Sequence, residues 1–353
     1  MKRGIVLMNL GSPDSTSVKD VRVYLDEFLM DERVIDKPWL LRALLVKAII
    51  VPFRAPKSAK AYESIWTKDG SPLIVLSRQL AEALDAGIEE PVTIAMRYGN
   101  PSPKQAFDEL LSSNPDLEEV ILIPMYPHYA MSSYETAVAY AMEHHKKGNY
   151  NFSLKTIKPY YKEENYIHAL CESIKPYLAG EWDHILFSYH GVPERHIYKG
   201  DVTGNHCLKV ADCCNTASPA HEFCYRHHCL VTTQIITERL GINKDKYTFS
   251  FQSRLGRDPW LEPYTAGMLE TLPQQGIKKL LVVCPAFISD CLETLEEIAE
   301  EGKEIFMHNG GESFEMIPCL NVHPLWVKAM ATWINNYKDG DETMILKQMF
   351  SKT

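Results

Sequence analysis

The chain of 353 residues lacks several common features, and each absence excludes a class of protein. Its Lys and Arg residues (37) are fewer than its Asp and Glu residues (46), and the net charge of −9 argues against a nucleic-acid partner, because phosphate binding requires clustered cations. The turns Gly11-Ser12-Pro13 and Gly191-Val192-Pro193 lack the Gly-x-Gly-x-x-Gly pattern, and their prolines remove amides that a pyrophosphate would need. A nucleotide-binding Rossmann enzyme is therefore disfavoured.

Leader-like and membrane-spanning runs are missing as well. Met1-Lys2-Arg3 leads directly into the strand-like Gly4–Met8, so we expect no signal peptide and a cytoplasmic protein. The most apolar stretch, Trp39–Phe53, is shorter than the about 20 residues that span a bilayer, and Arg42 and Lys47 interrupt it. It is either a core-facing helix or an exposed apolar lip that touches a membrane surface or an apolar ligand.

The chain contains two copies of one structural unit. Each copy has strand-like runs followed by helical patterns, which is typical of βα crossovers and parallel sheets. The matched pieces are Gly4–Pro13 with Ile185–Pro193, Thr93–Tyr98 with Thr248–Ser253, Val120–Tyr126 with Leu281–Phe287, and Tyr166–Leu170 with Trp326–Met330. We predict two similar doubly wound, Rossmann-like α/β domains with parallel sheets and an active-site cleft between them. The expected limits are 1–165 with the lip at about 30–70, 166–335 with a Cys-rich insert at about 200–230, and a segment 336–353 that packs back on the first domain.

Two strand ends in the second copy carry groups suited to proton or metal chemistry. Ile185–Phe187 leads into His190, and Leu280–Val283 leads into a helix that contains Glu293. Ligands bind at the carboxyl ends of strands in open α/β sheets, so a His facing a Glu there can bind a divalent metal, move protons, or do both. Leu10 occupies the place of His190 in the first copy, which indicates that the fold does not require a His at this position.

A row of carboxylates follows the second strand end. Glu293 and Glu297 lie four residues apart, hence on one face of the predicted helix, and Glu301 extends the row. Such a row can pass protons or a hydrated hard cation. The alternative is a solvated acidic helix face in a Glu-rich stretch.

Short motifs in a fixed order run along the whole chain. They are Leu7–Pro13, Tyr62 with Gly70–Pro72, Met96–Tyr98, Pro124–Tyr129, Ser188–Pro193, Phe251–Gly256 before Pro259–Leu261, Phe287–Glu297, and Leu320–Pro324. Together they resemble the motifs of the ferrochelatases, which insert ferrous iron into a porphyrin in haem synthesis. One departure is Cys291, because many relatives carry a His two residues before the Glu.

The resemblance implies a lyase that forms nitrogen–metal bonds, with Fe²⁺ as a substrate and two pyrrole protons released. His190 and Glu293 would then be the catalytic residues, and His190, Glu293 and Glu297 the groups that handle the metal. Protoporphyrin IX is the favoured porphyrin because the apolar lip is long. The alternatives are a coproporphyrin ferrochelatase, a cobalt or nickel tetrapyrrole chelatase, and a haem- or porphyrin-binding protein without turnover.

The resemblance also implies an apolar slot for the porphyrin, with polar groups at its rim. Arg97 is suited to the propionates of the ring, and a structural ion pair is its alternative role. Carried over by motif, the porphyrin-binding candidates are Leu10, Arg97, Tyr126, Phe287 and Trp260, with Tyr62, Ile65 and Ser71 near the entrance.

Two expectations about partners follow from the resemblance. The chain has no long extension of the animal kind at its C-terminus, so we expect a monomer. The lip implies peripheral contact with the inner membrane in addition to the cytoplasmic location.

A Cys-rich insert holds five of the nine cysteines. Such crowding favours a metal site, and some ferrochelatases carry a [2Fe-2S] cluster, which needs four thiolates. Zinc held by Cys and His ligands and a redox disulfide remain open, since no Cys-x-x-Cys pair is present. We favour Cys207, Cys214, Cys224 and Cys229 as ligands, with Cys213 as the adjacent alternative; His206, His221, His227 and His228 lie in the same stretch.

Overall fold

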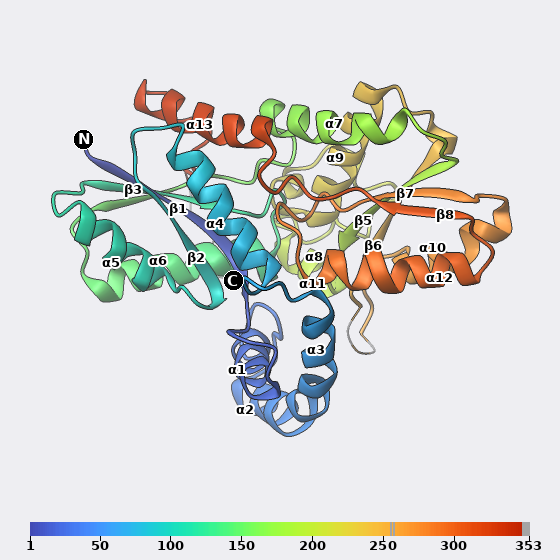
Figure 1. Cartoon of the computed structure of the whole chain (residues 1–353), viewed down its shortest axis with the longest axis horizontal. Coiled ribbons are helices and arrows are strands. Elements are labelled where there is room, and N and C mark those ends of the chain that lie inside the picture. Colours follow the sequence, from blue (N-terminus) through green and yellow to red (C-terminus); the bar gives the residue numbers. More distant parts are fainter. Residues whose placement is uncertain (255, 257, 348–353) are drawn as a thin grey trace. The chain divides into compact units, whose positions relative to one another are not determined.

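The computed structural model describes residues 1–254, 256 and 258–347 (Figure 1). Contacts divide this part of the chain into two units. The first comprises Met1–Met125, Met131–Lys158 and the described residues from Met330 onward, and the second comprises Tyr126–Ala130 and Pro159–Ala329. The domain limits at 165 and 335 stay predictions, and residues 348–353 of the predicted C-terminal segment and Leu255 of the Phe251–Gly256 motif lie outside the described residues.

The first unit contains a four-stranded parallel sheet in the order β2-β1-β3-β4. Its apolar strands β1 and β3 are buried along most of their length, as expected for a parallel sheet covered on both faces. The strands are β1 (Arg3–Ser12), β2 (Val92–Gly99), β3 (Glu119–Pro124) and β4 (Ser153–Thr156). The helices are α1 (Val18–Leu29), α2 (Trp39–Ala43), η1 (Leu44–Ile50), α3 (Val51–Ile65), α4 (Pro72–Asp85), α5 (Pro103–Ser113), η2 (Met131–Glu135) and α6 (Thr136–Gly148).

The second unit repeats this arrangement in the order β6-β5-β7-β8, again with parallel pairs. Its strands are β5 (His184–His190), β6 (Tyr247–Gln252), β7 (Lys279–Val283) and β8 (Ser313–Met316). Its helices are α7 (Glu164–Leu178), α8 (Glu194–Gly200), η3 (Pro219–Phe223), α9 (Tyr225–Leu240), η4 (Lys244–Lys246), α10 (Thr265–Thr271), η5 (Leu272–Gln275), α11 (Leu292–Leu295), η6 (Glu297–Gly302) and α12 (Lys303–His308). The last helix, α13 (Pro324–Lys338), begins in the second unit and ends in the first. The identical strand order confirms the predicted duplication and the doubly wound class.

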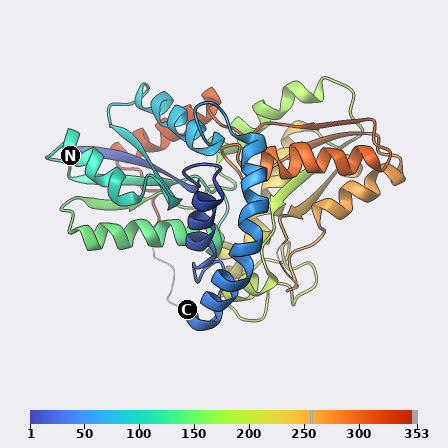
Figure 2. The ribbon, with the colours of Figure 1, turned by 60° about the horizontal axis from the view of Figure 1, so that its bottom comes forward.

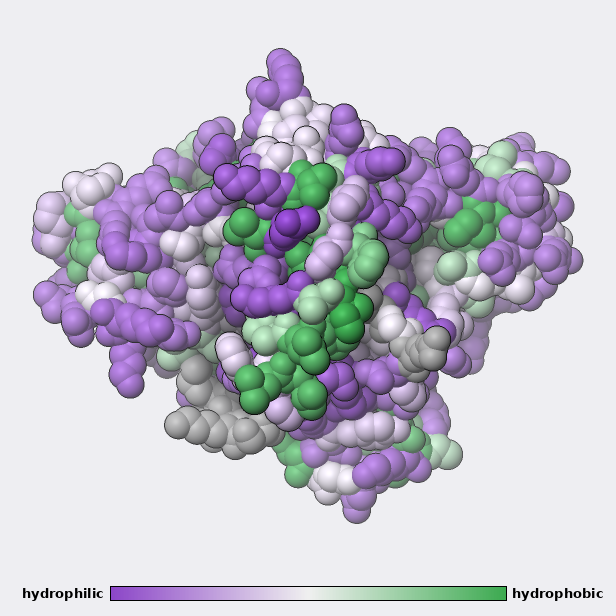
Figure 3. Space-filling model, turned by 90° about the horizontal axis from the view of Figure 1, so that it is seen from below, coloured by the Kyte–Doolittle hydropathy of each residue, from purple (hydrophilic) through white to green (hydrophobic). Residues whose placement is uncertain are grey.

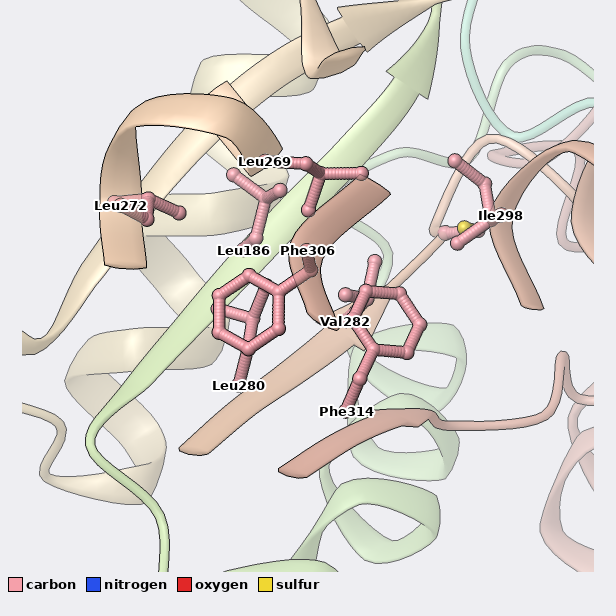
Figure 4. Packing of buried hydrophobic residues seen from close by; sticks show 9 residues of the cluster. Leu186, Leu269, Leu272, Leu280, Val282, Ile298, Phe306 and Phe314 are labelled. Carbon is pink, nitrogen blue, oxygen red and sulfur yellow. The ribbon is translucent and has the colours of Figure 1, made fainter. Parts of the chain in front are cut away.

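A buried apolar cluster holds the second sheet to its helices (Figure 4). Leu186 of β5 and Val282 of β7 pack with Phe306 of α12 and Phe314 of β8, and all four are less than 10% exposed. Full burial of side chains of this size contributes about 1.5–3 kcal/mol each. Phe287, one of the predicted porphyrin contacts, is partly buried against the edge of this cluster.

Glycines end the central strand of each sheet. A Cβ on Gly11 would lie 1.7 Å from the carbonyl oxygen of Tyr98, and one on Gly191 would lie 2.8 Å from that of Gln252. Any larger residue would push the neighbouring strand away. The Gly-x-Pro motif of the two copies is therefore a packing requirement, and it fixes where the preceding side chain leaves the strand.

The segment predicted as either a core helix or a lip is exposed. The helices α1 and α3 pack side by side at one end of the first unit (Figures 1 and 2). Figure 3 looks onto this end and shows hydrophobic atoms gathered in one strip. The large apolar side chains from 39 to 53 that are more than half exposed are Trp39, Leu40, Leu41, Leu44, Ile49 and Phe53. Among the residues that the structure describes, no helix is long and apolar enough to cross a bilayer.

Candidate active site

His190 is the last residue of β5, the central strand of the second sheet. The six residues before it are buried, whereas His190 itself is half-buried, so its side chain emerges where the strand ends. Its ring Nδ1 lies 2.6 Å from the carbonyl oxygen of Gly191. A proton on Nδ1 satisfies this contact and leaves the lone pair of Nε2 available to accept a proton or to bind a metal.

Two aromatic rings border this strand end. The ring of Phe287 has its centroid 6.3 Å from that of His190, at an angle of 64°. Trp260 forms a β-bridge with Pro193, and its ring would lie 3.2 Å from a Cβ on Gly191. The structure thus places Phe287 and Trp260 beside His190, while their contact with a porphyrin stays a prediction.

Glu293 lies on the short helix α11, whose start is built by a polar network. The hydroxyl of Thr294 accepts a hydrogen bond from the N–H of Cys291 and donates to the buried carboxylate of Asp290. The thiol of Cys291 hydrogen-bonds with the carboxylate of Glu293, and burial, followed by the charge of Glu293, raises the pKa of this thiol. Cys291 is therefore a protonated partner of Glu293, in the place where many relatives carry a His.

Glu297 is held by Ser253, the residue that follows the neighbouring strand β6. Its carboxylate accepts the Ser253 N–H at 2.7 Å and the Ser253 hydroxyl at 2.5 Å. Burial raises the pKa of Glu297; the hydroxyl of Ser253 and the charge of His190 lower it, and the charge of Glu293 raises it. Glu297 therefore lies within electrostatic range of both His190 and Glu293.

The predicted row of carboxylates does not continue to Glu301. A π-helix, η6, starts at Glu297, and the N–H of Glu301 bonds to the carbonyl of Glu296, five residues back. The wider turn changes the angular spacing of the side chains, and Glu301 is exposed. The i, i+4 pattern that placed Glu301 in the row assumes an α-helix.

Gln252 and Ser253 belong to the Phe251–Gly256 motif but are not among the predicted site residues, and the structure gives them specific contacts. Gln252 pairs with His190 in the sheet, and its side-chain amide donates to the carbonyl of Glu293 at 2.9 Å. Its side-chain oxygen accepts from Ser188 at 2.7 Å. Ser253 has a φ of 65°, which is unusual for a residue other than glycine. A strand ending in two polar residues beside a His-bearing strand is the signal that could have found them.

Arg97 lies in the first unit, where an acidic partner holds its guanidinium. The guanidinium pairs with Asp31 at 2.5 Å, donates to Thr136 at 2.7 Å, and lies 4.3 Å from the ring centroids of both Tyr98 and Tyr140. Burial favours the neutral form of Asp31, but Arg97 and hydrogen bonds, including one from Thr136, hold the pKa of this carboxyl below its usual value. Arg97 thus forms a structural ion pair within the first unit, which is the alternative to a role in binding. The contact of Arg97 with a propionate stays a prediction.

The other candidates are strand-end or helix-end residues. Leu10 lies between Asn9 and Gly11, whose sheet partners are Met96 and Tyr98, so it has the register of His190. Tyr62 and Ser71 are buried, Ile65 ends α3, and Tyr126 is a buried residue of the second unit.

The comparisons with known proteins agree with this architecture. The ferrochelatase family profile matches residues 2–338. A ferrochelatase of Opitutus terrae is 52% identical over 94% of this chain and 98% of its own, and one of Ectopseudomonas mendocina is 49% identical over 92% and 95%. This chain belongs to the ferrochelatase family.

Among solved structures, the same fold occurs in SirB from Bacillus subtilis with Fe3+. The TM-score is 0.52 at 13% identity, and the match covers 97% of this chain and 98% of that one. The sirohydrochlorin chelatase SirB from Bacillus subtilis subspecies spizizenii, in complex with cobalt, matches with a TM-score of 0.51 at 10% identity over 98% and 99%. The predicted chelatase-like fold is thereby confirmed.

This ferrochelatase-family chain brings four of its five insert cysteines together. Cys224 hydrogen-bonds with Cys207 and Cys214, and the bond with Cys207 raises the pKa of Cys224 to about 12. Cys229 is fully buried and interacts with Cys224 and Cys214. We call Cys207, Cys214, Cys224 and Cys229 the thiol group.

Cys213 is also buried, but its contacts differ from those of the thiol group. Its sulfur accepts the N–H of Leu208 at 3.3 Å, and its carbonyl lies 2.8 Å from Nε2 of both His206 and His221. The sulfur of Cys214 instead accepts a bond of 3.1 Å from Arg226. Within the described ranges, no group of three or more His, Cys, Asp or Glu side chains is arranged to hold a metal ion.

Proposed function

We propose that this chain inserts ferrous iron into a porphyrin to give haem, with His190 as the proton acceptor and Glu293 as the carboxylate that serves the metal. Membership of the ferrochelatase family supports the reaction. The observation that carries the assignment of roles is the orientation of the His190 imidazole. Its Nδ1 contacts the Gly191 carbonyl, which leaves Nε2 free, and Glu297 lies within electrostatic range.

The reaction requires a base, because a porphyrin loses two pyrrole protons as iron enters. Neutral His190 accepts a proton at Nε2, and the carboxylate of Glu297 stabilises the imidazolium that forms. Glu293 lies four residues before Glu297 and offers a second carboxylate to the incoming Fe²⁺. Gln252, at the end of β6, bonds to the backbone of Glu293, and the next residue, Ser253, bonds to the carboxylate of Glu297. These bonds would keep Glu293 and Glu297 in place during turnover.

The identity of the porphyrin is tested by an anaerobic assay of the purified protein with Fe²⁺. Protoporphyrin IX and coproporphyrin are compared by the loss of free-porphyrin fluorescence. We expect faster insertion into protoporphyrin IX, because the apolar lip is long and a coproporphyrin needs cations for four propionates. Faster insertion into coproporphyrin would identify the chain as a coproporphyrin ferrochelatase. Turnover with Co²⁺ or Ni²⁺ but not with Fe²⁺ would favour a cobalt or nickel chelatase. Binding without loss of fluorescence would leave a porphyrin-binding protein.

We also propose that the lip, residues 39–53, contacts the cytoplasmic face of the inner membrane as a peripheral anchor. Leu40 of α2 is 75% exposed and Phe53 of α3 is 81% exposed. Lys57 and Lys60 follow Phe53 on α3 and have exposed side chains. An exposed apolar surface beside basic residues binds an anionic lipid interface through both burial and charge.

The membrane contact predicts that the double variant Leu40→Asp, Phe53→Asp binds lipid at least about tenfold more weakly, because each side chain contributes on the order of 1 kcal/mol or more when buried. Co-sedimentation with vesicles of phosphatidylglycerol and phosphatidylethanolamine measures the effect. Val202→Asp, Met307→Asp is the matched control, since both positions are exposed and lie in the other unit. Equal binding of the two double variants would remove the lip from the membrane contact.

For the insert we propose that the thiol group holds a [2Fe-2S] cluster, with zinc as the alternative metal. Four buried thiols match the kind and number of donors that such a cluster takes, and Cys224 hydrogen-bonds with Cys207 and Cys214, but among the described residues the four sulfurs are not arranged as a metal-binding group. When bound, such a cluster supplies one-electron redox chemistry. The chain's own part is to bury the four sulfurs.

The thiol group predicts opposite outcomes for two adjacent cysteines. Cys214→Ser is expected to lose most of the bound metal, whereas Cys213→Ser keeps it, because Cys214 hydrogen-bonds with Cys224 while the sulfur of Cys213 accepts the N–H of Leu208. The measurement is iron, zinc and acid-labile sulfide per chain, together with visible absorption. Iron with sulfide supports the cluster, and zinc without colour supports the alternative. A metal-free wild type, or equal loss in both variants, would contradict the assignment.

A further inference from the structure

The helix that follows the Cys-rich insert is joined directly to the strand that carries His190. α9 begins at Tyr225, and the hydroxyl of Tyr225 donates a hydrogen bond of 2.8 Å to the backbone carbonyl of His190. Tyr225 is 5% exposed, and burial raises the pKa of its phenol, so the hydroxyl keeps its proton and remains a donor. Breaking this bond would leave a buried acceptor unpaired, which costs free energy, so the bond is a fixed point that holds the backbone of His190 to α9.

This fixed point lies on the peptide that orients the imidazole. The carbonyl of the His190–Gly191 peptide is held by Tyr225, and its amide, the N–H of Gly191, donates to the carbonyl of Gln252 at 2.8 Å. The imidazole in turn contacts the next carbonyl, that of Gly191, through Nδ1. A rotation of the peptide would therefore move the acceptor against which the ring of His190 is set.

The same tyrosine contacts the thiol group. Cys224 precedes Tyr225 in the chain, and Cys229 follows it by about one turn of α9. The thiol of Cys229 hydrogen-bonds with the side chain of Tyr225, and Cys224 hydrogen-bonds with Cys207 and Cys214. Tyr225 thus follows Cys224 in the chain, and its hydroxyl lies beside both the thiol of Cys229 and the backbone carbonyl of His190.

A second link runs from the same helix to the same strand. The hydroxyl of Thr233 donates to the carbonyl of Cys229 at 3.1 Å and lies 2.7 Å from the hydroxyl of Tyr189, the residue before His190. Both Tyr189 and Thr233 are fully buried. The last two residues of β5 are therefore fastened to the part of α9 that carries Cys229.

We propose that Tyr225 is a positioning residue for His190 and that it couples the thiol group to iron insertion. Holding Cys224 fixes the backbone from which Tyr225 extends, and holding Cys229 fixes the thiol beside the Tyr225 hydroxyl, which keeps that hydroxyl on the His190 carbonyl. Disturbing the thiol group releases that hydroxyl and lets the His190–Gly191 peptide turn. The coupling rests on the proposed role of His190 as the proton acceptor.

The first experiment removes only the hydroxyl. Tyr225→Phe is expected to lower kcat for iron insertion about tenfold or more, because a displaced catalytic group loses its alignment, while the KM for porphyrin changes less than about twofold. The metal content of the thiol group should stay at the wild-type level. Tyr198→Phe is the matched control, since its hydroxyl bonds to Glu194 on the surface of the same unit. A kcat for Tyr225→Phe equal to that of the control would overturn the positioning role.

The second experiment tests the coupling through a double-mutant cycle. Cys207→Ser disturbs the thiol group without touching Tyr225, and its effect on kcat is measured in the wild-type and Tyr225→Phe backgrounds. We expect a clear loss in the wild-type background and little further loss in the variant. Losses that multiply independently would overturn the coupling. If the wild type is active and Tyr225→Phe has the same kcat, this inference fails while the proposed function stands. If the wild type does not insert iron, the proposed function fails and this inference fails with it.

Discussion

His190→Ala is expected to lower kcat for iron insertion by about 10³-fold, because the variant loses the group that we propose as the acceptor of the pyrrole protons. No neighbouring side chain at the carboxyl end of β5 can take over this role, and the other imidazole of the strand, His184, lies at its opposite end beside Thr248. Ser188 is engaged with Gln252, and Tyr189 is fully buried, so neither offers a free base at the end of the strand. The measurement is single-turnover loss of porphyrin fluorescence under anaerobic conditions, with porphyrin binding followed separately.

The variant should remain folded, since His190 is half-buried and the strand is held by its backbone and by Gly191. His168→Ala is the matched control: this His lies on α7 of the same unit with half of its side chain exposed. We expect the control to keep wild-type kcat and the two proteins to melt within a few degrees of each other. Full activity in His190→Ala would remove this residue from the mechanism.

The duplication is the part of the fold that could be read from the sequence. Parallel strands buried on both faces are nearly continuous apolar runs, and the Gly-x-Pro turn repeats after the central strand of each copy. The alignment of Leu10 with His190 also corresponds to the observed register, since each stands beside the last residues of the neighbouring strand. A side chain that differs between two copies of one scaffold is informative because the scaffold does not require it.

Other parts depended on contacts between distant residues, which local patterns do not encode. Arg97 has the buried carboxylate of Asp31 as its partner, 66 positions away in the chain. The lip was ambiguous because its apolar residues satisfy both a core helix and an exposed surface, and packing alone decides between them. The bond from Tyr225 to His190 joins a helix start to a strand end, and nothing in the spacing of the two residues indicates it.

The acidic helix shows a third limit of sequence patterns. The spacing of Glu293, Glu297 and Glu301 predicts one face of an α-helix, whereas the π-turn that starts at Glu297 leaves Glu301 exposed. Glu293 and Glu297 keep a common environment because Gln252 and Ser253 fix the backbone of one and the carboxylate of the other. The two glutamates proposed to serve the metal are therefore the two that Gln252 and Ser253 contact.

Glu293→Gln should separate a functional carboxylate from a solvated acidic surface. The change keeps the volume of the side chain and removes its charge, and we expect kcat/KM for Fe²⁺ to fall about 10²–10³-fold. Glu300→Gln is the matched control, because Glu300 belongs to the same acidic run and is exposed. Wild-type turnover in Glu293→Gln would reduce the run to a solvated helix face.

The dependence on iron concentration then assigns the role of Glu293. If Glu293 only attracts Fe²⁺, its loss raises the KM for Fe²⁺, and saturating iron restores the wild-type rate, so kcat is unchanged. A carboxylate that also takes part in the insertion step leaves kcat low however much Fe²⁺ is supplied. We expect the second result, because Glu293 shares its surroundings with Glu297 and His190, and removing one charge changes the field in which the imidazole accepts its proton.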